Sequence, residues 1–261
     1  MHSWPESAHL VLDELRSARA LVAISVAVPH TTIRRSAREQ IRAALRETLG
    51  ALLHRPAASI SLISRPGRPL WVDLPDRSIG LSVSYAAISV VAAIHLRGAI
   101  GVDVMPVEHG ADWMSDWEFV VQNYPGTRTY GRIAGLAPQH QARAFAQAWT
   151  RFEACLKCLG LELTEWHPAL ERGLASCCVR GLVFSENMTG SIATNIRSER
   201  TLHAPQDDPG PHLRYWQWQP TGRTTCQFRL DAQAQPEITV ADALKRQPKQ
   251  SATAIVTPWS W

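Results

Sequence analysis

The chain has 261 residues, of which 45% are hydrophobic and 19% charged, so it can bury the core of one large or two moderate domains. Its formal net charge of +4 suits an acidic partner or a phosphorylated ligand and excludes the strong basic bias of a histone-like protein. No apolar run is long enough for a membrane span and the first residues lack a signal-peptide pattern, so we expect a cytoplasmic protein.

The first predicted elements are a buried strand and a long amphipathic helix. Residues 20–28 are apolar, rich in β-branched side chains and followed by Pro29, which is typical of a buried strand. Residues 36–53 repeat Leu and Ile at helical spacing and predict a helix. Arginines near its start, including Arg38, are ordinarily a solvated face, but their planar donors also suit phosphate.

Several short strands are predicted next. A strand is expected at 59–64, and the turn 65–69, which contains Arg68, follows it. Three further strands are expected at 80–85, 89–94 and 99–104. Their connections are so short that only antiparallel hairpins are expected between them. Asp103 interrupts the third of these strands, and an embedded Asp is costly unless it is paired or binds a metal.

The second half is organised around a helix predicted over residues 139–160. Glu153 and Lys157 lie four residues apart on one of its faces, an arrangement that is usually a surface pair worth ~0.2–0.5 kcal/mol. A short helix is expected near 116–124. Strands are expected at 176–184, 213–219 and 224–230, the last two forming a hairpin, with a loop at 198–212.

The five cysteines do not predict a disulfide framework, because their number is odd and Cys177 and Cys178 are adjacent. Cys155 and Cys158 form a CxxC motif, a spacing found in zinc and redox sites. Because this motif lies within the predicted helix, we expect both cysteines to be small, buried packing residues.

Four short motifs follow one another along residues 34 to 185. They are Gly67-Arg68-Pro69, Leu81-Ser82-Val83-Ser84, Gly101-Val102-Asp103 and Trp149-Thr150-x-x-Glu153-Ala154-x-x-Lys157. Each motif is weak alone, and the ordered set is more specific. In order and spacing the set resembles the Sfp-type 4′-phosphopantetheinyl transferases, whose motifs are Gly-Lys/Arg-Pro, Asn/Leu-x-Ser-His, Gly-Ile/Val-Asp-x-Glu and Trp-x-x-Lys-Glu-Ala/Ser-x-x-Lys.

This resemblance implies an α+β fold built as a pseudo-two-fold pair of similar lobes, with the active site between them. Each lobe would be a long helix against a small, mainly antiparallel sheet. Residues 1–105 would form the N-terminal lobe and 106–244 the C-terminal lobe, followed by a flexible tail at 245–261. The resemblance also implies a monomer.

The implied reaction transfers the 4′-phosphopantetheine arm of coenzyme A to a serine of an apo acyl or peptidyl carrier protein and releases 3′,5′-ADP. Mg²⁺ is the implied cofactor and an acidic carrier protein the implied partner, with no role for nucleic acid or a membrane. Such carriers serve fatty-acid, polyketide and nonribosomal-peptide biosynthesis. Which of these three pathways the chain serves is left open by its sequence.

The resemblance assigns catalytic roles to three residues. Asp103 and Glu153 would supply the carboxylates that bind Mg²⁺, which prefers a few carboxylates together with phosphate oxygens and water. Glu153 would also act as general base toward the serine hydroxyl, directly or through water. Lys157 would stabilise the pyrophosphate or the departing 3′,5′-ADP.

Four further residues are expected to bind coenzyme A. Arg68 would contact a coenzyme phosphate, and Ser84 and Tyr85 would contact the pyrophosphate region. Arg38 is one of several arginines that could hold the ribose 3′-phosphate.

Three positions depart from the family pattern. Met105 stands where the second acid of the strand motif is usual, Phe152 replaces a Lys, and Tyr85 replaces a His. These departures keep open the alternative of a catalytically weakened paralogue that binds coenzyme A or a carrier protein without transfer. A third reading, an Arg-rich nucleic-acid binder, has neither a recognition motif nor a strong charge bias in its favour.

Overall fold

The computed structural model describes nine stretches of the chain. These are residues 21–27, 34–65, 69–74, 79–86, 89–107, 116–184, 187–195, 215–218 and 225–226. All of them belong to a compact unit that spans Met1–Leu230, and a second unit is formed by Asp231–Trp261. The predicted turn with Arg68, the loop at 198–212 and the tail from 245 lie outside the described residues.

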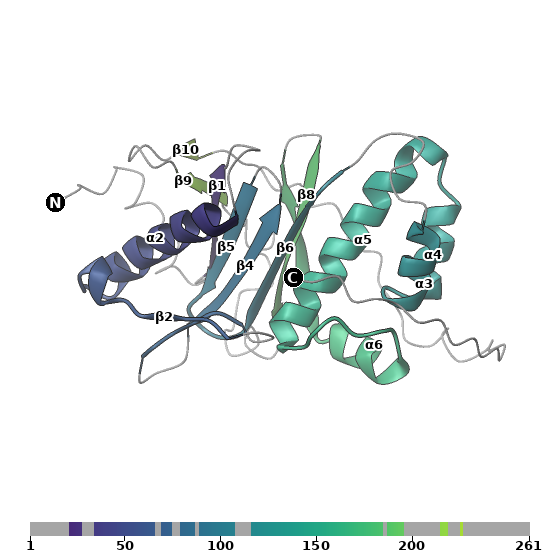
Figure 1. The fold of residues 1–261 in the computed structure, drawn as a ribbon. Coiled ribbons are helices and arrows are strands. Elements are labelled where there is room, and N and C mark those ends of the chain that lie inside the picture. Colours follow the sequence, from purple (N-terminus) through teal and green to yellow (C-terminus); the bar gives the residue numbers. More distant parts are fainter. Residues whose placement is uncertain are drawn as a thin grey trace, which may run out of the picture. The chain divides into compact units, whose positions relative to one another are not determined.

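The larger sheet has five strands in the order β10-β9-β1-β5-β4 (Figure 1). Its strands are β1 (Leu21–Ala27), β4 (Gly80–Ala86), β5 (Ser89–His95), β9 (Tyr215–Trp218) and β10 (Thr225–Cys226). Neighbouring strands are antiparallel except β1 and β9, which run parallel. The expected hairpin pairing of the last two strands and of β4 with β5 is confirmed.

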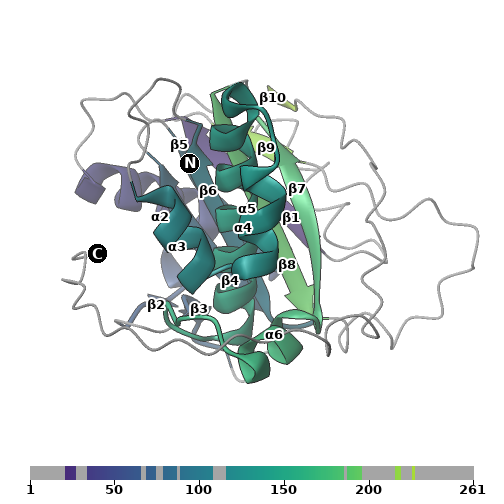
Figure 2. The ribbon, with the colours of Figure 1, turned by 90° about the vertical axis from the view of Figure 1, so that its right-hand side faces the viewer.

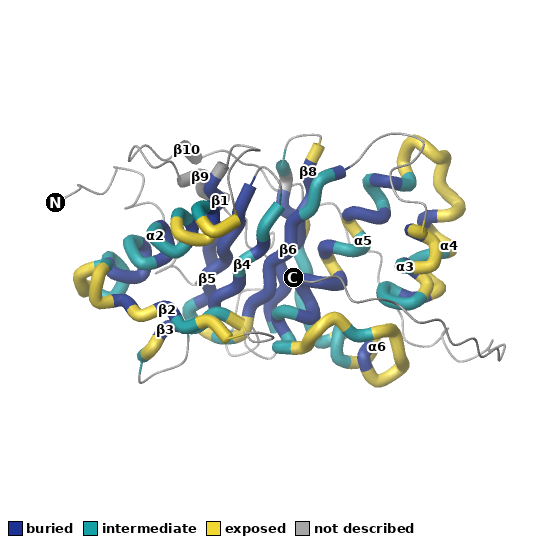
Figure 3. Tube along the Cα trace, viewed as in Figure 1, coloured by how far each residue is buried: buried dark blue, intermediate teal, exposed yellow. Residues whose placement is uncertain are grey.

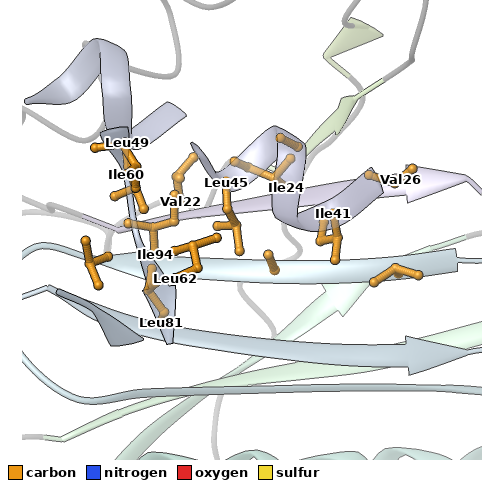
Figure 4. Packing of buried hydrophobic residues seen from close by; sticks show 14 of the residues in the cluster. Val22, Ile24, Val26, Ile41, Leu45, Leu49, Ile60, Leu62, Leu81 and Ile94 are labelled. Carbon is orange, nitrogen blue, oxygen red and sulfur yellow. The ribbon is translucent and has the colours of Figure 1, made fainter. Parts of the chain in front are cut away.

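Helix α2 (Arg34–Leu52) packs on one face of the larger sheet. Its inner face presents Ile41, Leu45 and Leu49, which are fully buried. These side chains meet the alternate residues Val22 and Ile94 of β1 and β5 (Figure 4). The 3₁₀ turn Ala57–Ser59 and the short strands β2 (Leu62–Ile63) and β3 (Trp71–Val72) follow α2.

The opposite face of β1 and β5 is also buried, against the smaller sheet. Ala23 and Ala93 of the larger sheet share an apolar cluster with Val102, Leu182 and Ile192 of the smaller sheet. Because both faces of β1 and β5 are buried, their sequences are nearly continuous apolar runs and do not alternate between apolar and polar residues (Figure 3).

The smaller sheet has the order β6-β8-β7 and is antiparallel throughout. Its strands are β6 (Ile100–Pro106), β7 (Cys177–Val183) and β8 (Met188–Asn195). Helix α5 (Pro138–Leu159) lies across this sheet, and the shorter helices α3 (Trp117–Asn123), α4 (Thr127–Ala134) and α6 (Pro168–Leu174) pack around it (Figure 2). The described chain is therefore a mixed α+β structure, in which the five-stranded and the three-stranded sheet each carry one long helix and β2 and β3 form a separate antiparallel pair.

Helix α5 approaches β6 very closely at Gly101. A Cβ atom at this position would overlap the carbonyl oxygen of Ala154 and the amide nitrogen of Cys158. The absence of a side chain at Gly101 therefore sets how near the helix comes to the strand. The helix ends as expected at Gly160, whose φ of 67° lies in the left-handed region.

The predicted hairpin between the second and third strands of the 80–104 region is wrong. Strand β6 belongs to the smaller sheet, where it pairs with β8 (Met188–Asn195). It still runs beside β4, but the two strands are joined through serine side chains. The Val102 N–H donates to Ser82 Oγ at 3.0 Å, and the Val104 N–H donates to Ser84 Oγ at 3.2 Å. These hydroxyls give the Val102 and Val104 amides the acceptors that a neighbouring backbone strand would otherwise supply.

Strand β8, central to the smaller sheet, was not predicted. Three of its buried residues are polar: Thr189, Ser191 and Thr194. Their presence hides the apolar pattern by which a buried strand is usually recognised. Within the described part of the chain, none of the helices combines the length and apolar character of a membrane span.

Candidate functional site

Asp103 lies in the middle of β6 and is almost completely buried. Its Oδ1 accepts a hydrogen bond of 2.8 Å from Ser84 Oγ of β4. The same serine oxygen accepts the Val104 N–H, so one hydroxyl both joins the strands and orients the carboxylate. The predicted residues Asp103 and Ser84 are thus brought into direct contact.

Lys157 reaches the same carboxylate from helix α5. Its Nζ lies 2.6 Å from Asp103 Oδ1 and donates a second hydrogen bond, of 3.2 Å, to the carbonyl oxygen of Val102. The side chain of Lys157 is 31% exposed and that of Asp103 is 10% exposed, so this ion pair opens to solvent on the lysine side. The close approach of α5 at Gly101 is what allows the ammonium to reach β6.

Glu153 lies one helical turn before Lys157 and is buried. Its Oε1 is enclosed and has no hydrogen-bond partner among the described residues. Burial raises the pKa of the Glu153 carboxyl above its usual value, the Lys157 ammonium opposes that shift, and the Asp103 carboxylate adds to it. Glu153, Asp103 and Lys157 therefore interact electrostatically as one group, and an acceptor atom of Glu153 is left for a further partner.

A second polar contact ties α5 to the smaller sheet beside this group. Thr150 Oγ1 and Ser191 Oγ lie 3.1 Å apart in the interior, and either hydroxyl can be the donor. Thr150 lies about one turn before Glu153, and Ser191 is paired with Asp103 across β6 and β8. Sequence reasoning assigned no role to Ser191 or Ser82. The alternation of Ser82 and Ser84 along β4 is the signal that could have identified Ser82.

The residues predicted to bind coenzyme A are placed less closely together. Tyr85 is half-buried on β4, and the Arg34 guanidinium stands 5.5 Å from the centroid of its ring. Arg38 is exposed on α2, and no hydrogen bond or ion pair links it to Asp103 or Glu153 in the described structure. Arg68 lies outside the described residues.

The departures from the family pattern are accommodated by apolar packing. Phe152 is buried with Leu156 and Leu170, which confirms the prediction that it belongs to the apolar stripe of the helix. Met105 packs against a cluster that includes Trp117 and Phe145. Neither position leaves a cation or a carboxylate in the site.

The oxygen donors present are those that a small divalent cation prefers. Mg²⁺ is commonly held by one or two carboxylates together with substrate phosphates and water. Asp103 and Glu153 provide two carboxylates, and the unpartnered Glu153 Oε1 is an available ligand atom. Among the described residues there is no group of three or more His, Cys, Asp or Glu side chains arranged to hold a metal.

Comparison with protein-family models and with curated protein sequences found no match to this chain.

Proposed function

We propose that the protein transfers the 4′-phosphopantetheine arm of coenzyme A to a serine of an apo acyl or peptidyl carrier protein. The observation that carries this proposal is the meeting of Asp103, Glu153 and Lys157. They come from a strand and a helix that are distant in sequence, yet Lys157 Nζ lies 2.6 Å from Asp103 Oδ1 and both charges act on Glu153. A simple surface pair at positions 153 and 157 would not involve a buried strand carboxylate.

Asp103 and Glu153 would hold the Mg²⁺ in this proposal. When bound, the cation neutralises pyrophosphate charge and orients the phosphate for attack. Ser84 keeps the Asp103 carboxylate in place through its 2.8 Å hydrogen bond. Met105 contributes no ligand, so the site would use two carboxylates.

Glu153 would take the proton from the carrier serine hydroxyl. Burial raises the pKa of the Glu153 carboxyl, so its carboxylate is a stronger base than that of an ordinary Glu and takes a proton from a hydroxyl more readily. Lys157 would place its ammonium beside the departing 3′,5′-ADP and offset the negative charge that develops there. The net charge of +4 would favour an encounter with an acidic carrier protein.

The two helix-on-sheet arrangements would be the two lobes of the proposed fold. Helix α2 on the larger sheet and α5 on the smaller sheet are comparable units, and β4 and β6 lie side by side where the units meet. In this arrangement Tyr85, near the end of β4, and Arg34, at the start of α2, would contact coenzyme A phosphates. We expect the protein to act as a monomer.

The alternative is a protein that binds coenzyme A or a carrier protein without transfer. Phe152 favours it, because this buried side chain leaves the helix without the cation that usually precedes the catalytic Glu. Coenzyme A binding and phosphopantetheine transfer must therefore be measured separately.

The deciding experiment mixes the protein with coenzyme A, Mg²⁺ and apo carrier proteins of the acyl and peptidyl types. We expect the carrier to gain the mass of a phosphopantetheine arm, and we expect Glu153→Gln to lose this activity. Glu162→Gln, an exposed position just after α5, is the matched control and should retain it. Coenzyme A binding without transfer to any carrier would favour the alternative, and absence of both would refute the proposal.

A further inference from the structure

Three cysteine side chains converge where α5 packs against β8 and β7. Cys155 and Cys158, one turn apart on the helix, are buried in an apolar cluster with Ala154 and Ala193. Cys177, the first residue of β7, packs against the same cluster and is only half-buried. The CxxC motif in the helix is thus joined by a third thiol that is distant in sequence.

The three thiols share one cluster, so each can act on the ionisation of the others. Cys155 and Cys158 both donate to the sulfur of Cys177, which lowers the pKa of the Cys177 thiol. The contact with Cys177, together with burial, raises the pKa of the Cys158 thiol. Cys177 is also the most exposed of the three thiols, so an oxidant reaches it first, and the thiolate is the form that reacts with oxidants.

We propose that Cys177 and the CxxC motif of α5 form an oxidation site, in which Cys177 becomes linked by a disulfide to Cys155 or Cys158. A hydroperoxide is the oxidant. The Cys177 thiolate attacks the peroxide, the O–O bond breaks, and Cys177 becomes a sulfenic acid as water or an alcohol leaves. A helix thiol then attacks the Cys177 sulfur, the S–O bond breaks and a second water leaves, so two thiols have supplied two electrons.

Bond formation requires the sulfur atoms to move closer, because a disulfide is only about 2.05 Å long. Helix α5 is already in contact with β6 at Gly101 and has no room to move further toward that strand. Among the described strands, β7 is at the edge of its sheet and has β8 as its one neighbour. We therefore assign the adjustment to the start of β7, which leaves the contact between Lys157 and Asp103 in place.

The disulfide would enclose the segment that contains α6. Both possible bonds join the end of α5 to the start of β7, with Pro168–Leu174 between them. A bond across this segment restricts the unfolded chain and so stabilises the folded one. The inference does not depend on the proposed transferase activity.

The test begins with the full chain, reduced and freed of reductant in the presence of a chelator. It is treated with hydrogen peroxide, quenched with catalase and alkylated, and its thiols are counted and its peptides mapped without reduction. We expect two of the five thiols to be lost and Cys177 to be found linked to Cys155 or Cys158. Reductant should restore all five.

Three variants make the result specific. Cys177→Ala and the double variant Cys155→Ala with Cys158→Ala should form no disulfide under the same treatment. Cys178→Ala is the matched control, because the next residue along a strand points to the other face, and it should lose two thiols like the parent chain. In the parent, oxidation should raise the melting temperature, and reductant should reverse the rise.

Three results would overturn the proposal. The parent chain could keep all five free thiols, Cys177 could become linked to Cys178 or Cys226 instead, or Cys177 could be oxidised to sulfinic acid without any cross-link. The peptide map of the parent decides between these outcomes even if a cysteine variant fails to fold.

Discussion

Glu153 is a carboxyl whose surroundings favour its neutral form. Its side chain is buried, one oxygen lacks a partner, and burial is the first cause of its raised pKa. A carboxyl with a raised folded-state pKa binds its proton more tightly in the folded than in the unfolded chain. Its contribution to stability is therefore greatest below pH 4.5, the ordinary value, and falls as pH rises toward the folded-state pKa.

We expect Glu153→Gln to stabilise the protein at neutral pH while it abolishes transfer. The amide cannot ionise, so the loss of stability on going from pH 4 to pH 7 should be smaller in the variant. Thermal unfolding across this pH range, beside Glu162→Gln as control, measures the effect. A variant less stable than the parent at pH 7 would show that Glu153 is not held in an unfavourable charged state.

Ser82 and Ser84 form a natural pair for testing the strand junction. Each hydroxyl accepts a hydrogen bond from an amide of β6, but of the two only Ser84 also donates a hydrogen bond to Asp103. Substituting either serine with Ala leaves a buried N–H without its acceptor, which costs about 1–3 kcal/mol. We expect urea unfolding to show a loss of stability for both variants, and a larger one for Ser84→Ala because it also removes a donor from the Asp103 carboxylate.

Metal affinity should separate these two variants. Ser84→Ala releases the Asp103 carboxylate from its hydroxyl donor and should weaken Mg²⁺ binding in the presence of coenzyme A by about tenfold or more. Ser82→Ala should bind Mg²⁺ as the parent does. Equal losses in both variants would mean that Ser84 acts only through the backbone of β6.

At the scale of elements, the site depends on how closely α5 lies against β6. Gly101→Ala introduces a Cβ into the space held by the Ala154 carbonyl oxygen, so the helix or strand must move. We expect destabilisation of about 1–3 kcal/mol or more and a loss of transfer, because Lys157 would be drawn away from Asp103. Gly181→Ala on β7 is the control, since a Cβ there meets nothing within 4 Å.

Chemical denaturation of the Gly101→Ala and Gly181→Ala variants, followed by transfer assays on folded protein, checks this expectation. Unchanged activity in a folded Gly101→Ala variant would show that the helix position does not control the site.

The same elements show what the sequence could and could not predict. Helices α2 and α5 were predicted to within a few residues, because their apolar stripes follow from local spacing. The pairing of β6 was mispredicted, since hairpin geometry is a local rule and β8 is a distant partner with polar interior positions. Asp103 was identified because a buried Asp in an apolar strand requires a partner. The hydrogen bonds from β6 amides to Ser82 and Ser84 could not be predicted, because residue spacing does not reveal that β4 and β6 lie side by side.

At the scale of the whole molecule, the two sheets share one interior. Residues of β1 and β5 face α2 on one side and the smaller sheet on the other. The two clusters are therefore joined through the same two strands, and we expect Met1–Leu230 to unfold as one cooperative unit.

Two core substitutions check this cooperativity. Leu45→Ala in the cluster beneath α2 and Ile192→Ala in the cluster between the sheets should each cost about 2–5 kcal/mol. Both should shift one common transition, seen alike by far-ultraviolet circular dichroism and tryptophan fluorescence. Two separate transitions, each moved by only one of the variants, would show that the sheets unfold independently.

The hydrogen bonds that Ser82 and Ser84 of β4 accept from β6 also affect hydrogen exchange. The amides of Val102 and Val104 are protected by side-chain oxygens rather than by a neighbouring backbone carbonyl. Their deuterium uptake therefore follows the orientation of two hydroxyl groups, one of which also holds Asp103. A ligand that binds the Asp103 carboxylate should change the exchange rate of the Val104 amide more than that of the Val102 amide. The difference between these two exchange rates therefore reports whether a ligand is bound at Asp103.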